Sequence, residues 1–444
     1  MNEARPQPDS LGRAGTSTFA VAVLSVAIGL GSSVAISRSL GPTGKGGYDL
    51  AVASAALTVM IIGFSLPGGV TLAVARGLAS PVPLLIALLG LAAAQAGLAY
   101  LFLSVLATTP FAAALLPADR SSVVLATIAS IVGATSALAY SRSILIGLQR
   151  FVAASWRDLW GRIATVALII AAVVLGGLVN RQPSPVLLLM ATVAGTLLAA
   201  AFMIQGVARL GLGRQGRSGI RNVIGYARPM YVGNLVQFLN YRLDVFLVAA
   251  FAGLRELGLY ALAVTLGQLL WIVSNSAAGV LFPRVASASP AVAAREAARL
   301  ARIALLIGVV GALCLAVVAT PFIEIVYGPA YAGSVPPLLA LLPGVVAFMA
   351  ASVLASYIAG LGQLRINLII SVIALCATVP LDLLLIPRIG AVGAAMASTV
   401  SYTLSAVVTV RWAMKLGGLP VRDLLVAKRA DLVDGVTALR RLVR

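Results

Sequence analysis

Four polar residues share one side of a predicted helix near the middle of the chain. Asn234, Gln237, Tyr241 and Asp244 are spaced at i, i+3, i+7 and i+10, which places them within about 80° of one another. Arg242 points to a different side of that helix, so we do not expect it to pair with Asp244. Two interpretations remain. Arg242 binds an anion while Asp244 is its counter-ion or couples transport to protons or sodium, or these residues form a structural polar network.

Further candidates flank this stripe. Arg228 lies about 21 Å along the same helix from Arg242, near its predicted cytoplasmic end. In the next apolar segment, Gln268, Trp271 and Asn275 share a face that can contact sugars by hydrogen bonding and stacking. Ordinary helix packing explains these three residues equally well.

Three more arginines lie at the ends of predicted helices: Arg38, Arg76 and Arg142. Long cationic side chains at helix ends extend to the membrane surface by default. Their alternative role is to bind an anionic head group. Which role each arginine has depends on how the helices pack.

A proline and two glycines interrupt the second apolar segment. Pro67, Gly68 and Gly69 predict a break, which either serves as a gate or is a common feature of membrane helices. Farther along, Asp158 and Arg162 are spaced i, i+4 and are predicted to form an ion pair.

The composition requires that these residues be positioned by membrane helices. Of the 444 residues, 61% are hydrophobic and 10% are charged, and the mean hydropathy is +1.05. These values exclude an ordinary soluble enzyme, a disordered chain and a small secreted scaffold. The absence of histidine excludes histidine-based catalysis, metal binding and proton relay. Cys314 and Cys376 lie in apolar runs and are interpreted as core residues.

Twelve segments are long and apolar enough to span a membrane. The first is interpreted as a retained span rather than a signal peptide, because no cleavage pattern follows it. The predicted spans cover residues of about 16–37, 48–70, 82–107, 122–147, 159–180, 185–208, 226–252, 257–282, 301–322, 335–359, 366–387 and 390–415.

The cations orient these spans. With the N-terminus in the cytoplasm, 25 of the 32 Lys and Arg residues fall on the cytoplasmic side, six fall outside, and Arg242 lies within a span. Both termini are therefore predicted to be cytoplasmic. The formal net charge of +19 reflects topology, so nucleic acid is not predicted as a partner.

An internal repeat divides the chain. Residues 41–52 align with residues 253–264 at an offset of 212, pairing Gly46 with Gly258 and Tyr48 with Tyr260. Two lobes of six helices are thus predicted, with a cavity between them. The predicted boundaries are an N-terminal segment 1–15, lobes 16–208 and 223–415, a cytoplasmic loop 209–222 and a basic tail 416–444. The tail is either an interfacial amphipathic helix or solvated.

No nucleotide site is predicted. The segment around Lys45 resembles a phosphate-binding loop superficially, but Ser39 and Gly46 occupy positions where that loop needs Gly and then Ser or Thr. We therefore expect no ATP site and no cofactor beyond a coupling proton or sodium ion.

Five motifs occur in order along the chain: Arg38–Tyr48, Asp244–Leu247, Gly258–Ala263, Leu281–Val285 and Ile386–Ala395. Together they resemble the polysaccharide transporter (O-antigen flippase) family of the multidrug/oligosaccharidyl-lipid/polysaccharide exporter superfamily. The resemblance extends from about residue 16 to 415.

This resemblance implies an all-α, MATE-like membrane protein of two pseudo-symmetric six-helix bundles that alternate between V-shaped states. It implies transfer of a polyprenyl-pyrophosphate-linked glycan between leaflets of a bacterial inner (plasma) membrane. Membrane lipids and the glycosyltransferases or polymerase of the same pathway are the implied partners. Arg242 best matches the cationic cavity residues of the family. The first two spans lack the internal arginines of peptidoglycan-precursor flippases, which disfavours a lipid II flippase.

Other functions remain open. The nearest is an ion-coupled multidrug or metabolite exporter of the same superfamily, in which Asp244 is the coupling acid. A polytopic glycosyltransferase or polymerase is disfavoured, because the predicted outward turns are too short to carry an active site.

Overall fold

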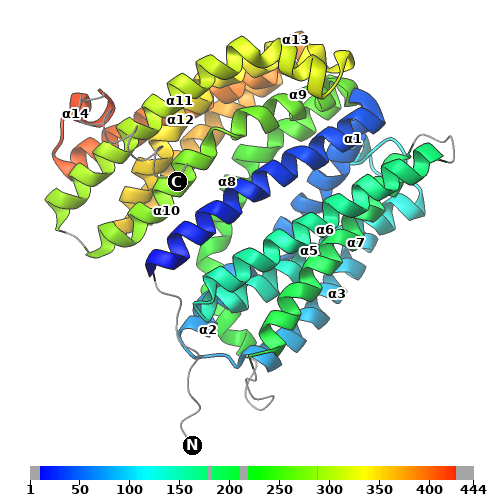
Figure 1. Ribbon diagram of the computed structural model, residues 1–444, viewed down its shortest axis with the longest axis horizontal. Helices are drawn as coiled ribbons and strands as arrows, with labels where there is room; N and C mark the ends of the chain where they lie inside the picture. Colours follow the sequence, from blue (N-terminus) through cyan, green and yellow to red (C-terminus); the bar gives the residue numbers. More distant parts are fainter. Residues whose placement is uncertain (1–10, 179–182, 211–218, 288, 427–444) are drawn as a thin grey trace, which may run out of the picture. The chain divides into compact units, whose positions relative to one another are not determined.

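The computed structural model describes residues 11–178, 183–210, 219–287 and 289–426, and every regular element in these ranges is a helix (Figure 1). The predicted segment 1–15, loop 209–222 and tail 416–444 lie partly outside the described residues.

The chain divides into two compact units, Met1–Gly258 and Leu259–Arg444. The first contains α1 (Leu11–Ile62), α2 (Leu66–Ala75), α3 (Pro81–Ala107), α4 (Ala112–Leu115), α5 (Ser122–Gly147), α6 (Phe151–Leu178), α7 (Pro185–Ala208) and α8 (Ile220–Phe251). Helix α9 (Gly253–Gln268) begins in the first unit. The second continues with α10 (Trp271–Ser287), α11 (Pro290–Val326), a 3-10 helix (Pro329–Ser334), α12 (Val335–Gly360), α13 (Leu364–Gly417) and α14 (Val421–Leu425).

Eight helices among the described residues are long and apolar enough to cross a membrane. A ninth span is obtained if α9 and α10, which are bent by 48° relative to each other, count together. Two of the eight, α1 and α13, contain 52 and 54 residues, far more than the roughly 20 that one crossing needs. Each has an internal break, at Gly41 (φ 65°) in α1 and at Ile389 and Gly390 in α13. The outer turn predicted around residues 38–47 is thus a sharp glycine kink between two helices.

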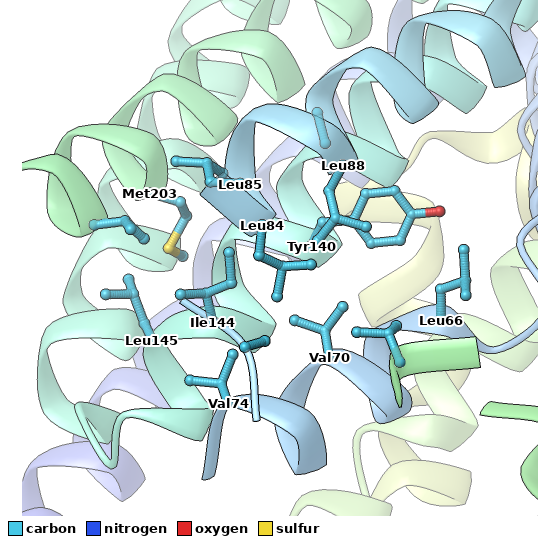
Figure 2. Packing of buried hydrophobic residues seen from close by; sticks show 14 of the residues in the cluster. Leu66, Val70, Val74, Leu84, Leu85, Leu88, Tyr140, Ile144, Leu145 and Met203 are labelled. Carbon is cyan, nitrogen blue, oxygen red and sulfur yellow. The ribbon is translucent and has the colours of Figure 1, made fainter. Parts of the chain in front are cut away.

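One core cluster of the first unit is aliphatic and encloses the phenol of Tyr140. Leu84 and Leu88 of α3, Val70 of α2 and Ile144 of α5 are fully buried around Tyr140 (Figure 2). These side chains interlock α2, α3 and α5. They fix the part of the predicted second span that forms α2 against its neighbours.

The internal repeat reappears as equivalent contacts. A Cβ atom on Gly46 would lie 1.8 Å from the Leu254 carbonyl oxygen, and one on Gly258 would lie 2.0 Å from that of Pro42. These are reciprocal contacts, because Pro42 and Leu254 are also related by the repeat offset. Backbone therefore packs directly on backbone, as in other small-residue helix crossings in membranes.

The repeated tyrosines also have equivalent roles in their own units. The Tyr48 hydroxyl hydrogen-bonds Thr192 of α7 at 2.8 Å, and the Tyr260 hydroxyl hydrogen-bonds Ser398 of α13 at 3.3 Å. In each unit the repeated tyrosine thus links its own helix to a later one: α1 to α7 in the first unit, and α9 to α13 in the second.

Candidate functional site

A broken helix forms the centre of the polar interior of the first unit. Residues 63–65 separate α1 from α2, and Phe64 and Ser65 adopt positive φ angles of 45° and 54°. The break therefore lies directly before the predicted Pro67-Gly68-Gly69 motif. Pro67 lies in the first turn of α2. A backbone N–H there has no partner within the helix, so a proline at this position costs no helical hydrogen bond.

Buried polar side chains satisfy the backbone at this break. Gln95 of α3 is 4% exposed, and its Nε2 donates to the Ile62 carbonyl at 3.1 Å. The Tyr140 hydroxyl donates to Gln95 Oε1 at 3.0 Å. In lipid an unpaired carbonyl is costly, so this network makes an interrupted helix tolerable at membrane depth.

A cavity of about 380 Å³ adjoins the break, and we name it the break cavity. Its polar lining residues are Ser65, Thr135, Ser136, Tyr140 and Asn234. Asn234 of α8 donates from Nδ2 to Ser65 Oγ at 3.0 Å. Asn234, the first residue of the predicted polar stripe on α8, thus contacts the break between α1 and α2.

A second cavity of about 290 Å³, the Arg162 cavity, is lined by α1, α5, α6 and α7. Arg162 Nε donates to Asp158 Oδ2 at 3.0 Å, which confirms the predicted ion pair. The remaining polar lining residues are hydroxyls: Ser32, Thr135, Thr165 and Thr196. Arg162 is half-exposed and Asp158 is less so, which leaves the guanidinium accessible from the cavity.

The two cavities are adjacent, because Thr135 of α5 lines both. Together they present hydroxyls, a carboxamide and a guanidinium within one unit. The sequence predicts Arg162 only as the partner of Asp158 and as a cytoplasmic cation, and not as a cavity residue. It does not single out Gln95 of α3 or Thr135, Ser136 and Tyr140 of α5.

Helix α2, which follows the break, packs closely on α8. A Cβ atom on Gly69 would lie 2.2 Å from the Val223 carbonyl oxygen, and one on Gly68 would lie 2.8 Å from Met230 Sδ. Arg76 donates to the Tyr226 hydroxyl at 2.8 Å, with its guanidinium carbon 4.8 Å from the Tyr226 ring centroid. We name these α2–α8 contacts the latch.

The rest of the α8 stripe has mixed surroundings. Tyr241 hydrogen-bonds the Gln237 side chain one turn away. Asp244 is buried, at 7% exposed, and its Oδ1 accepts from the Val245 amide at 2.8 Å. Arg242 is exposed, so the two charges lie on different sides as predicted.

The remaining candidate residues are not gathered at these cavities. Arg38, Arg142 and Arg228 are exposed on α1, α5 and α8 and line neither cavity. One correction concerns Gln268, Trp271 and Asn275 of the second unit: they do not share one regular helix, because α9 ends at Gln268 and α10 begins at Trp271.

Trp271 also has an aromatic environment. Its ring centroid lies 5.1 Å from that of Phe348 and 5.7 Å from that of Tyr402. These contacts are typical of helix packing. Within the described ranges, no group of three Asp, Glu, Cys or His residues is arranged to hold a metal ion.

Residues 11–289 match a family described as "Polysaccharide biosynthesis protein". No curated protein matches the sequence.

Solved structures give close matches in fold. An inward-closed lipid II flippase MurJ superposes with a TM-score of 0.73 at 13% identity, covering 96% of this chain and 91% of that one. An inward-facing MATE family multidrug resistance transporter of the MOP superfamily gives 0.64 at 14% identity, covering 91% and 95%. A Vibrio cholerae MATE transporter gives 0.57 at 16% identity, covering 91% and 99%. The chain is a multi-pass membrane protein with a MurJ- and MATE-like helical fold.

Proposed function

The chain belongs to the polysaccharide biosynthesis protein family, and from this premise we propose that it is a flippase for a polyprenyl-pyrophosphate-linked oligosaccharide. The glycan would pass from the inner to the outer leaflet of a bacterial plasma membrane. The observation that carries the proposal is the pair of adjoining cavities, in which Arg162 accompanies eight hydroxyl and carboxamide side chains: Ser32, Ser65, Thr135, Ser136, Tyr140, Thr165, Thr196 and Asn234.

The chemistry of the cavities suits such a head group. Arginine keeps its charge at any physiological pH and forms paired hydrogen bonds with phosphate oxygens. Hydroxyls and carboxamides can form hydrogen bonds with sugar hydroxyls. These bonds replace the hydrogen bonds to water that a hydrated glycan gives up when it enters the cavities. Arg242 is the second proposed cation, because it is exposed on α8, about 12 Å along the helix from Asn234.

We further propose twelve spans in two lobes, with both termini cytoplasmic. The breaks at Gly41, at residues 63–65 and at Gly390 support this count, because each long helix then supplies two spans or half-spans of ordinary length. The lobes 16–208 and 223–415 remain the proposed boundaries. In this arrangement α8 is the first helix of the second repeat.

Alternating access then assigns the latch a role. Helix α8 belongs to the second repeat, yet it packs on α2 of the first through Gly69, Arg76 and Tyr226. We propose that the latch closes the cytoplasmic side in this state and opens when α8 moves away from α2. The unusual backbone at Phe64 and Ser65 supplies the hinge.

The test is carried out in cells that depend on this protein for surface polysaccharide. Arg242→Ala should reduce the polysaccharide at the surface while the amount of protein in the membrane is unchanged. Arg388→Gln is the matched control, because Arg388 is also an exposed arginine but lies on α13 rather than on α8. Normal surface polysaccharide in a correctly inserted Arg242→Ala protein would contradict the role of Arg242.

A buried carboxylate favours a second candidate, an ion-coupled exporter of drugs or metabolites. Asp244 is 7% exposed within α8, as a coupling acid would be. If Asp244→Asn abolishes drug efflux while surface polysaccharide remains normal, the exporter replaces the flippase. If transport of the lipid-linked glycan persists in Asp244→Asn after the ion gradients are collapsed, Asp244 has no coupling role.

A further inference from the structure

A hollow in the second unit is apolar on its walls and cationic at its rim. It has a volume of about 370 Å³ and lies between α11, α12, α13 and α14. Its floor is made by small residues, Ala347 and Ala350 of α12 and Ala406 of α13. Val421 and Leu425 of α14 and Arg411 of α13 border it, and we name it the Arg411 groove.

The short helix α14 is held firmly at one end of this groove. Leu424 is 2% exposed in the core of the second unit. The buried Arg302 of α11 donates from Nη1 to the Asp423 carbonyl oxygen. Because both contacts involve α14, the groove has a fixed end rather than one formed by a loosely attached segment.

The charges around the groove are nearly all positive. Arg411, Lys415 and Arg422 are exposed. The sequence from Leu364 to Val426 contains two acidic residues, Asp382 and Asp423. Within the described part of the chain, no hydrogen bond, ion pair or ring contact engages Arg411. The groove therefore offers a guanidinium beside an apolar hollow.

The depth of the groove corresponds to a membrane surface. Lys415 Nζ lies 5.4 Å from the Trp412 ring centroid, and tryptophan with a neighbouring cation is typical of the boundary between hydrocarbon and head groups. The last span ends here, at Gly417, before the Gly418 turn leads into α14. With the proposed orientation, this boundary is the cytoplasmic one, where anionic lipids attract cations.

We propose that the Arg411 groove binds one anionic phospholipid of the cytoplasmic leaflet. An acyl chain fills the hollow between α11, α12 and α13, and the phosphate pairs with Arg411. An isolated phosphate ion would leave the apolar hollow empty, and an uncharged apolar molecule would leave Arg411 without a partner. The lipid is distinct from the glycan carrier, because the groove lies in the second unit and shares no residue with the two cavities of the first.

The experiment measures lipid binding to the purified full-length protein in detergent. Dioleoyl phosphatidylglycerol or dioleoyl phosphatidylcholine is added, and native mass spectrometry counts the bound lipid. Wild-type protein should retain one phosphatidylglycerol in preference to phosphatidylcholine. Loss of one cation near a lipid surface should weaken phosphatidylglycerol binding about fivefold in Arg411→Gln.

Two further variants separate the parts of the site. Ala347→Phe keeps Arg411 but fills the hollow, so binding of both lipids should be lost. Arg388→Gln removes an arginine of the same helix that does not line the groove and should bind like wild type. The thermal stability of each variant without added lipid verifies its fold.

Equal binding of the two lipids by wild type would overturn the proposal, as would unchanged preference in Arg411→Gln. Retained binding in Ala347→Phe would place the lipid elsewhere on the surface and overturn it as well. None of these readouts depends on glycan transport.

Discussion

At the scale of single residues, Arg162 is the most informative side chain. Its pairing with Asp158 follows from their spacing and is confirmed at 3.0 Å. Its place in a cavity does not follow from the sequence, because Ser32, Thr135 and Thr196 come from three other helices. Helical periodicity predicts which residues share a face of one helix, whereas the packing of several helices determines which faces meet.

We predict that Arg162→Gln lowers glycan transport at least about tenfold, because a charge-assisted phosphate contact contributes about 1.5–3 kcal/mol. Asp158→Asn should have a smaller effect, since it removes the competing carboxylate and keeps the cation. The measurement is transport per molecule of inserted protein. Equal loss in the two variants would indicate that the ion pair is only structural.

The break network gives a prediction of stability. Tyr140→Phe should lower the free energy of unfolding by about 1 kcal/mol, because it loses one buried hydrogen bond. Gln95→Leu should cost more, since the Ile62 carbonyl also loses its donor. Thermal unfolding in detergent compares the two with wild type. A stable Gln95→Leu protein would mean that water or another group replaces the amide.

At the scale of elements, the sequence placed the interruption of the second span close to its actual position. The Pro67-Gly68-Gly69 motif marks it, but the residues with positive φ are Phe64 and Ser65, which precede the motif and are not glycines. Gly68 and Gly69 instead permit α2 to approach α8. Glycine patterns in membrane helices thus indicate close packing as often as bending.

The latch predicts a shift in accessibility. Tyr226→Ala removes a hydrogen bond and a cation–π contact, together about 1–2 kcal/mol, so the open population should rise about tenfold. The readout is the cytoplasmic thiol labelling of an Asn234→Cys variant lacking its two native cysteines. Tyr226→Phe, which keeps the ring, should increase labelling less.

Tyr100→Ala, on the exposed side of α3, is the matched control for the latch. It should leave the labelling of the Asn234→Cys variant unchanged. If Tyr226→Ala also leaves labelling unchanged, the latch is not a gate.

The repeated glycine contact can be tested with a matched set. Gly46→Ala and Gly258→Ala should each destabilise the protein by about 1–3 kcal/mol, because each Cβ atom would collide with a backbone carbonyl. Gly97→Ala on α3 meets nothing within 4 Å and should be neutral. Thermal unfolding compares the three. Neutral Gly46→Ala and Gly258→Ala variants would refute the backbone contact.

At the scale of the whole molecule, the sequence predicted the all-helical membrane fold well, because long apolar segments are a strong signal. The family resemblance is likewise confirmed by the match over residues 11–289. The assignment of α8 to a compact unit could not be predicted. Helix α8 follows the repeat boundary in sequence, but in this structure its contacts place it in the unit Met1–Gly258.

Arg162 and Arg242 are the two cations proposed to carry an anionic, lipid-linked glycan across the membrane. The direct measurement reconstitutes the purified protein in liposomes with a polyprenyl-pyrophosphate-linked oligosaccharide and follows the appearance of glycan in the opposite leaflet. We predict transfer by wild type and by Arg388→Gln, and at least about tenfold slower transfer by Arg162→Gln and by Arg242→Ala. Transfer at wild-type rates by both of these variants would contradict the role of the two arginines, and no transfer by the wild-type protein would contradict the flippase function.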